Sequence, residues 1–489
     1  MTTVTPATTT ASGELKEFTY GGTKYCLITL SALELKEYQA MKAMFYSTDG
    51  FKDGTYLNQW PKEKDTTEMP FYTLRKQSAH YDNVYAPELE AMVTPIFSKN
   101  QTRVVTGNAR AVKIVEKFVD NPSARDEVMP DYMKRLQLSS KNYSSAFLVC
   151  DAPKDRPTTG KDDTNPAFMP YSFYLAPNQT SGYTFNNKGA LQSLVYKASL
   201  DERSGTDEDE DVYVVWLRLD DGSCVNYKTK DGKEPTKEEV IPLPEFPVKL
   251  RELNTREEPN RMAKPRYYSE FMLSRYMYNL SSWVDDNYRK NCFAILTYNG
   301  NVGDLAVGSD TVLQYPEDSL TPSFIAPPVA HLDSMNGQIE AVRLRIKENM
   351  NSTAVISSMA SGEARKQADV KRIEDMKQEA KELQSDEDWL VNVALSNYVD
   401  GEYKYEVNYN TDFESLTVGD SIANYQMAVD SEAVTTEAKK IIGAEILKLI
   451  SSNDETLKDL LISAQESGSL IDESFAIESN VPVNEDDSE

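Results

Sequence analysis

One run of five acidic residues, Asp207 to Asp211, offers a group of potential metal ligands. Carboxylate oxygens are the ligands that Ca²⁺ and Mg²⁺ prefer in proteins. A calcium-binding loop also needs a glycine at its turn and a more distant glutamate, and this run lacks both at the required spacing. Because runs of like charge are usually solvated, we interpret the segment as an acidic surface loop, with a divalent-cation site as the alternative.

The sequence offers few candidate residues for a zinc site, for nucleophilic catalysis or for nucleotide binding. The two histidines, His80 and His331, are far apart in the sequence, and the cysteines lack the paired spacing of a zinc or redox site. The cysteines are Cys26, Cys150, Cys224 and Cys292. Neither a phosphate-binding Gly-Lys-Ser/Thr nor a GxSxG nucleophile elbow is present. We therefore expect no catalytic residue, no metal site, no cofactor and no enzyme, while a carboxylate-dependent nuclease stays open as the alternative.

Charge and hydropathy narrow the function classes further. The 489 residues include 52 basic and 78 acidic side chains, which gives a net charge of −26 at pH 7. Such an acidic chain is a poor candidate for wrapping nucleic acid tightly, although it could let DNA pass without sticking. No apolar stretch reaches the roughly 18 residues of a membrane span, and the N-terminus lacks the pattern of a secretory signal. We expect reduced thiols in a cytoplasmic fold without a membrane partner.

Two amphipathic helical patterns, Tyr267–Lys290 and Asp333–Asn349, lie at the middle of the chain. In each, large apolar residues recur at steps of three or four, which predicts one apolar stripe along a helix. The stripes are Tyr268, Met272, Tyr276, Leu280 and Trp283 in the first pattern, and Met335, Ile339, Val342, Ile346 and Met350 in the second. We predict a pair of helices around which the chain is organised, with two ordinary core helices as the simpler interpretation.

The segments next to these helices differ from them. Phe293–Pro328 contains glycines and four prolines, which predicts a small β or mixed lobe held between the helices. Ser352–Gly362 is a loop of small residues, for which an ordinary helix–helix connection is the alternative to a functional role. Glu363–Leu395 has the length and mixed charges of a long, exposed helix.

Local signals in the first half predict a mixture of helices and strands. Ser31 followed by Glu34 has the spacing of a capping box, which predicts the start of a helix. Ala146–Cys150 is a short apolar run typical of a buried strand. In the second half, the alternation from Tyr403 to Tyr409 predicts a half-exposed strand.

The middle of the first half contains a hairpin signal followed by a proline-rich stretch. Asp220-Asp221-Gly222 joins Val212–Leu219 to Ser223–Tyr227, and this composition is typical of a tight β-turn. Lys228–Asn260 contains five prolines and many charges, which predicts a linker.

Several segments follow one another in a familiar order. They are SSAFLVCDAP (Ser144–Pro153), TFNNKGALQSLVYK (Thr184–Lys197), the helix from Pro265 to Lys290, the stretch from Phe324 to Met350, STAVISSMASGEARKQ (Ser352–Gln367), and Tyr409 to Phe413 before a helical C-terminus. This series resembles the portal proteins of tailed double-stranded DNA bacteriophages of the long-tailed, siphovirus type. The resemblance covers roughly 87–467, and it lies in the order of the segments, since no single motif is specific.

The resemblance implies an α+β portal-protein fold. Its parts would be an α/β wing at 1–264 (with 1–13 disordered), a first stem helix at 265–292, a small mixed clip at 293–328, a second stem helix at 329–350, a tunnel loop and long helix at 351–395, a wing return strand at 396–420, and a helical crown with an acidic tail at 421–489. This chain departs from the family in its short, acidic end, which leaves the extent of the crown open.

The resemblance also assigns functional residues, none of them catalytic or metal-binding. The tunnel loop facing DNA would contain Ser352, Thr353, Ser357, Ser358, Met359, Ser361 and Gly362. Tunnel-lining candidates on the second stem helix are Glu340, Arg343, Arg345, Lys347 and Glu348. The three cations would form a basic ring, or alternatively pair with the two glutamates on the helix surface. The clip docking surface would contain Tyr298, Asn299, Asn301, Asp304 and Tyr315.

The implied function is a channel without catalysis of its own. Family members form twelve-membered homo-oligomeric rings at one capsid vertex, through which double-stranded DNA is packaged, retained and ejected. The implied partners are the terminase large subunit of the packaging motor, then a head–tail adaptor, together with major capsid and scaffold proteins; assembly would occur in the host cytoplasm and the product would reside in the virion. Another head–tail connector or minor capsid protein is the alternative, and a DNA-processing enzyme is the more distant one.

Overall fold

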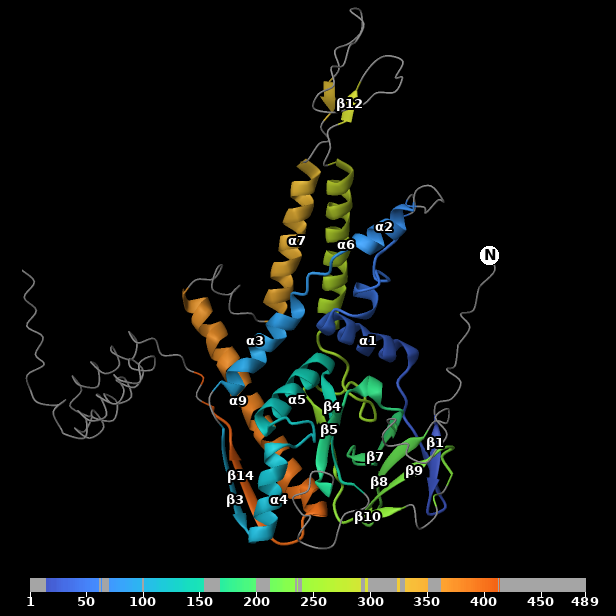
Figure 1. The fold of residues 1–489 in the computed structure, drawn as a ribbon, viewed down its shortest axis with the longest axis vertical. Helices are drawn as coiled ribbons and strands as arrows, with labels where there is room; N and C mark the ends of the chain where they lie inside the picture. Colours follow the sequence, from blue (N-terminus) through green and yellow to red (C-terminus); the bar gives the residue numbers. More distant parts are fainter. Residues whose placement is uncertain are drawn as a thin grey trace, which may run out of the picture. The chain divides into compact units, whose positions relative to one another are not determined.

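The computed structural model of the protein describes residues 15–60, 63, 70–98, 101–153, 168–198, 212–233, 235, 240–291, 295–297, 323–325, 330–350, 362–411 and 413 (Figure 1). These residues belong to one compact unit that extends to Phe413. They form a mixed α+β fold, which agrees with the predicted class at that level.

Helices dominate the first part of the chain. After the hairpin of β1 (Glu17–Tyr20) and β2 (Thr23–Cys26) come α1 (Ala32–Tyr46), α2 (Phe71–Ser78), α3 (Tyr85–Phe97), α4 (Ala109–Asp120) and α5 (Met129–Tyr143). The predicted capping box starts α1, because Ser31 Oγ accepts from the Glu34 N–H at 3.2 Å and the Ser31 N–H donates to Glu34 Oε2 at 2.7 Å. Between α3 and α4, β3 (Thr102–Gly107) interrupts the helices.

Two antiparallel sheets follow. In the first, β4 (Ser145–Asp151) lies between β11 (Val248–Glu252) and β5 (Tyr171–Leu175). The second has the order β10 (Ile241–Leu243), β9 (Cys224–Thr229), β8 (Tyr213–Arg218), β7 (Leu191–Lys197) and β6 (Gly182–Phe185). The predicted buried strand is β4, whose first six residues are buried, and the predicted hairpin is β8–β9.

The predicted linker at Lys228–Asn260 is wrong in part. Its residues include β10, which pairs with β9, and β11, which pairs with β4. Pro242 lies in β10, an edge strand, where a missing backbone N–H leaves no ladder bond unmade. Proline content therefore marked edge positions and turns here rather than a segment without structure.

The paired helices are α6 (Tyr268–Asn291) and α7 (Ala330–Asn349), and both confirm the predicted helical patterns. They lie side by side, and the short strands β12 (Ile295–Thr297) and β13 (Ser323–Ile325) lie beyond their far ends and pair antiparallel (Figure 1). The chain thus leaves along α6, turns through a small sheet and returns along α7.

A second long helix, α9 (Gly362–Trp389), follows α7 and packs against α3, α5 and β14 (Tyr403–Asn408). It ends in a π-helical turn, η5 (Leu390–Ala394), and a 3₁₀ turn, η6 (Leu395–Tyr398). The predicted strand is β14, which pairs antiparallel with β3. Gly107 ends β3 at φ +136°, and a Cβ there would lie 2.5 Å from the Glu402 carbonyl, so this pairing needs glycine.

Candidate functional site: the paired helices and their supports

The two paired helices share one hydrophobic core with the first part of the chain. Phe271, Met277 and Tyr278 of α6 are buried in the same cluster as Val342 and Ile346 of α7. The stripe predicted for α7 faces this cluster as expected. Helix α6 has more neighbours, because α1, α2 and α7 all pack against it.

The stripe predicted for α6 coincides only in part with the face that α6 buries, because Leu280 is buried and Tyr268 packs against the core. Met272 is 50% exposed and Tyr276 is 48% exposed, whereas Phe271, Ser274 and Met277 are buried. Helices α1, α2 and α7 all pack against α6, so its buried face is wider than one stripe and leaves Met272 exposed. Met272 and Tyr276 of the predicted stripe consequently lie at the surface, whereas Leu280 is buried and Tyr268 and Trp283 are half-buried.

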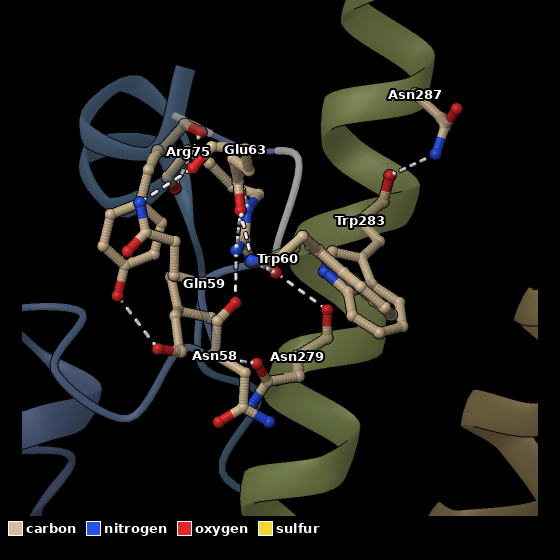
Figure 2. A network of polar contacts seen from close by, with 12 residues as sticks. Asn58, Gln59, Trp60, Glu63, Arg75, Asn279, Trp283 and Asn287 are labelled. Atoms are coloured by element: carbon tan, nitrogen blue, oxygen red, sulfur yellow. Dashed lines mark hydrogen bonds and ion pairs between the residues drawn. The ribbon is translucent and has the colours of Figure 1, made fainter. Parts of the chain in front are cut away.

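A buried arginine fixes α2 against α6 (Figure 2). Arg75 is 2% exposed, and its Nε and Nη2 donate to the two carboxylate oxygens of Glu63 at 2.7 Å each. Its Nη1 donates to Ser282 Oγ of α6 at 2.9 Å, and its Nη2 also donates to the Asn58 carbonyl at 2.6 Å. The bidentate carboxylate neutralises the charge of the guanidinium, and the two further acceptors help to fix its position.

The segment before Glu63 is attached to α6 by a second set of contacts (Figure 2). The Asn58 N–H donates to Asn279 Oδ1 at 2.7 Å, and Asn279 Nδ2 donates to the Tyr56 carbonyl at 3.1 Å. The Trp60 ring lies 4.2 Å from that of Trp283, with centroids as reference. Trp60 is still 47% exposed, so this pair extends the apolar surface of Met272 and Tyr276 along α6.

The five tunnel-lining candidates on α7 differ in their surroundings. Arg343 bonds to Glu340 one turn away, as the pairing alternative predicts, and also to Asp82, and this hydrogen-bonded carboxylate raises the pKa of Arg343 above its usual range. Lys347 Nζ lies 3.3 Å from Glu88 Oε1 of α3. Arg345 and Glu348 are exposed. Whether these side chains line a channel stays a prediction.

Several predicted site residues lie outside the described residues. These are the acidic run Asp207 to Asp211, the clip residues Tyr298, Asn299, Asn301, Asp304 and Tyr315, and the tunnel-loop residues Ser352, Thr353, Ser357, Ser358, Met359 and Ser361. Gly362 is the first residue of α9. Within the described ranges, no group of three or more His, Cys, Asp or Glu residues is arranged to hold a metal, and no helix is long and apolar enough to cross a membrane.

Sequence reasoning missed the buried acid that holds the end of α9. Glu387 is fully buried and accepts hydrogen bonds from Arg103 Nε at 2.7 Å and Nη2 at 3.1 Å. The hydroxyls of Tyr405 and Tyr409 donate to the same carboxylate. Burial and the neighbouring carboxylate raise the pKa of both tyrosines, so the hydroxyls stay protonated as donors. This cluster joins α9 to β3 and to the chain segment of β14 and Tyr409.

Three further ion pairs, made by two acidic residues, hold α9 along its length. Asp386 lies 2.8 Å from both Arg251 Nε and Lys249 Nζ of β11, and the Arg251 and Asp386 side chains are almost completely buried. Nearer the middle of α9, Glu379 lies 2.7 Å from Lys141 Nζ of α5. The sequence offers one signal for these contacts, the acidic triplet from Asp386 to Asp388 beside Trp389. This triplet does not indicate which cations, more than a hundred residues away, its members pair with.

Comparisons with known proteins give similarity to solved structures but not to a family or a curated protein. Neither a family model nor a curated protein matches this chain. Among solved structures, the fold is similar to a chain described as "Neck of empty GTA particle computed with C6 symmetry". The TM-score is 0.45 and the sequence identity 8%, over 76% of this chain and 92% of that chain.

Proposed function

We propose that this chain is a portal protein, a non-catalytic subunit of a ring at one capsid vertex through which double-stranded DNA is packaged, retained and ejected. The order of segments in the sequence supports this, and so does what those segments build. An antiparallel pair, α6 and α7, has a small two-stranded sheet at its far end and is followed by the long helix α9. On this proposal the pair is the stem, 293–328 the clip and 352–362 the tunnel loop.

One observation carries the proposal, namely the uncovered apolar strip of α6. Met272, Tyr276 and the Trp60–Trp283 pair place large apolar side chains at the surface of a helix that already has three neighbours. Surface apolar residues that are scattered singly need no explanation, whereas a row of them on one helix marks a contact with another protein. Aromatic and methionine side chains are also enriched at such contacts.

The outer face of α7 is a suitable counterpart on a second copy. Leu344 is exposed there, and a Cβ added to Gly337 would meet no atom within 4 Å. Ala341 lies between them on the same face and is exposed as well. Small residues allow a neighbouring helix to approach closely. Since the α6 strip and the α7 outer face are different surfaces of one chain, contact between them joins copies head to tail, and such heterologous contacts can close into rings.

The charge of the chain suits a channel that must not hold DNA. Each copy has a net charge of −26, so a ring of twelve would have −312 before counterions. Such a wall repels phosphates and forms few of the phosphate–cation contacts that make binding tight. DNA would therefore slide through the ring while the terminase motor and later a head–tail adaptor dock at the clip.

Negative-stain imaging of the purified protein tests the proposal. We expect annular particles from the unaltered chain and from Leu33→Glu, a control at a highly exposed apolar residue of α1. The double variant Met272→Glu, Tyr276→Glu should stay monomeric, because it introduces unpaired charges into the contact.

Three results would contradict the proposal. A monomer under every assembly condition would exclude the ring, and normal rings from the double variant would exclude the α6 strip as the contact. Metal-dependent DNA cleavage that disappears when one carboxylate is changed would exclude a non-catalytic role. Many copies per particle, rather than one ring at a single vertex, would instead favour a different connector or a minor capsid protein.

A further inference from the structure

A groove away from the paired helices has a charge opposite to that of the chain. It has a volume of about 880 Å³ and lies between α1, α5, β5 and the end of β7. Among the described residues, its lining includes four cations, Lys42, Arg125, Arg135 and Lys197, and no acidic residue. The chain as a whole has 78 acidic and 52 basic residues, so the positive charge of this described lining departs from the average. Glu127, which is not part of this lining, pairs with Arg135.

The floor of the groove is rigid and aromatic. The Tyr132 ring lies 6.0 Å from that of Tyr174, and the Phe173 ring lies 5.7 Å from that of Tyr196. Tyr132 is buried, and its hydroxyl shares a 2.7 Å hydrogen bond with Ser172 Oγ. Cations above an apolar, aromatic floor form a surface that can bind an anionic group and an apolar side chain together.

The groove also contains the open edge of a sheet. Strand β5 is the last strand of its sheet and pairs with β4 on one side. On the other side, the Ser172 N–H donates to the Pro122 carbonyl at 2.6 Å. Alternation along a strand places the Tyr174 and Ala176 backbone groups on this same side. The Ala176 N–H donates to Gln179 Oε1, whereas the Tyr174 N–H has no partner among the described residues.

We propose that this groove binds a short acidic peptide segment of another protein, which pairs with the Tyr174 backbone in an extended conformation and places carboxylates beside the four cations. An extended peptide supplies the carbonyl that the Tyr174 N–H lacks, as strand addition to a sheet edge requires. Arginine binds carboxylates in a bidentate way, which favours acidic side chains at alternate positions of that peptide. The inference concerns a surface apart from α6 and α7, so it does not depend on ring formation.

The test uses fluorescence polarisation with labelled heptapeptides in which glutamates alternate with one apolar residue type, Glu-Val-Glu-Val-Glu-Val-Glu being the first member of the set. The unaltered full-length chain should bind at least one member. The double variant Arg125→Glu, Lys42→Glu should weaken that binding about tenfold or more, since each charge reversal removes an attraction and adds a repulsion. Lys188→Glu, an exposed cation in the β6–β7 turn, is the matched control and should change affinity less than about twofold.

A second measurement separates strand addition from simple charge attraction. Amide hydrogen exchange at Tyr174 should slow about tenfold or more in the complex, because the N–H becomes hydrogen-bonded. A peptide N-methylated at alternate residues should bind more weakly. Far-ultraviolet circular dichroism of the variants checks that they fold, and Arg125→Gln, a milder change, should lower affinity in the same direction.

Four outcomes would overturn the proposal. Failure of every acidic peptide in the set to bind at millimolar concentration would exclude the site. Equal binding of lysine-for-glutamate peptides would exclude the charge argument, and unchanged exchange at Tyr174 in a saturated complex would exclude pairing at the β5 edge. If short DNA bound in the groove and the acidic peptide could not displace it, the four cations would be assigned to phosphate binding instead.

Discussion

Replacing Arg103 by methionine should destabilise the chain by about 3–5 kcal/mol, because it leaves a buried carboxylate without its cation. The Glu387 side chain is 0% exposed and that of Arg103 is 13% exposed, so water cannot replace the lost guanidinium. After the substitution only the hydroxyls of Tyr405 and Tyr409 would still donate to Glu387. Methionine has a similar length and no charge, so the packing of the stem of Arg103 is largely retained.

A double-mutant cycle separates the ion pair from other effects of the substitution. Glu387→Gln removes the charge while keeping an acceptor for the tyrosines, and the double variant lacks both charges. We expect the double variant to be more stable than the sum of the single effects predicts, by about 2 kcal/mol or more, since the unpaired buried charge is absent from it. The control is Lys24→Met, which breaks a pair with Glu17 whose side chains are both about half exposed, and which should cost under about 1 kcal/mol.

The assay is urea unfolding followed by far-ultraviolet circular dichroism, at one protein concentration and with the assembly state checked by mass measurement. Concentration must be fixed because association stabilises the folded chain. If Arg103→Met lowered the free energy of unfolding by less than about 1 kcal/mol, or if the coupling energy were near zero, the pair would behave like an exposed salt bridge. Either result would refute the argument that burial makes the loss of Arg103 costly.

Three further predictions concern other parts of the chain. Arg75→Met should cost about 3–5 kcal/mol in urea unfolding and should expose the 57–63 segment to proteolysis, whereas an unchanged midpoint would show that the contacts of Figure 2 are dispensable. Burial raises the pKa of Tyr85, Tyr132 and Tyr405 above the ordinary value near 10, so the folded state keeps protons that the unfolded state loses. The free energy of unfolding should therefore keep their full contribution below about pH 10 and should fall above it by about 1.4 kcal/mol per pH unit for each tyrosine. A urea midpoint that stays constant above pH 10 would contradict this expectation. Deleting Ser357 to Ser361 should leave rings in negative-stain images but impair DNA packaging or retention, and loss of the ring itself would make this loop structural.

Elements specified by neighbouring residues could be predicted from the sequence. The capping box at Ser31 and Glu34 and the β8–β9 turn at Asp221 and Gly222 depend on contacts within four residues, and both occur as predicted. The helical patterns of α6 and α7 and the alternation of β14 are equally local.

Features that depend on distant partners could not be predicted in this way. Periodicity identified α6 as amphipathic, but the direction in which it faces follows from α1, α2 and α7 together. Strand β11 has no strong local signal and exists because β4 offers a free edge to Val248 and its neighbours. The pairs of Glu387 with Arg103 and of Asp386 with Arg251 join residues 284 and 135 positions apart, and a sequence with 78 acids gives no means of choosing these two.

The polar contacts and the apolar strip are both explained by one requirement, namely that the helices keep a fixed orientation relative to the rest of the chain. Buried ion pairs often contribute little net stability compared with apolar side chains, but they accept only one geometry. Here the buried pairs of Arg75 and of Glu387 occur where α6 and α9 meet the rest of the chain, and the partly exposed pairs of Arg343 and Lys347 occur at α7. The apolar side chains that could have added stability within the chain, Met272 and Tyr276, are left at the surface. A chain that fixes the direction of α6 while leaving Met272 and Tyr276 uncovered has a helix surface suited to packing against another protein chain.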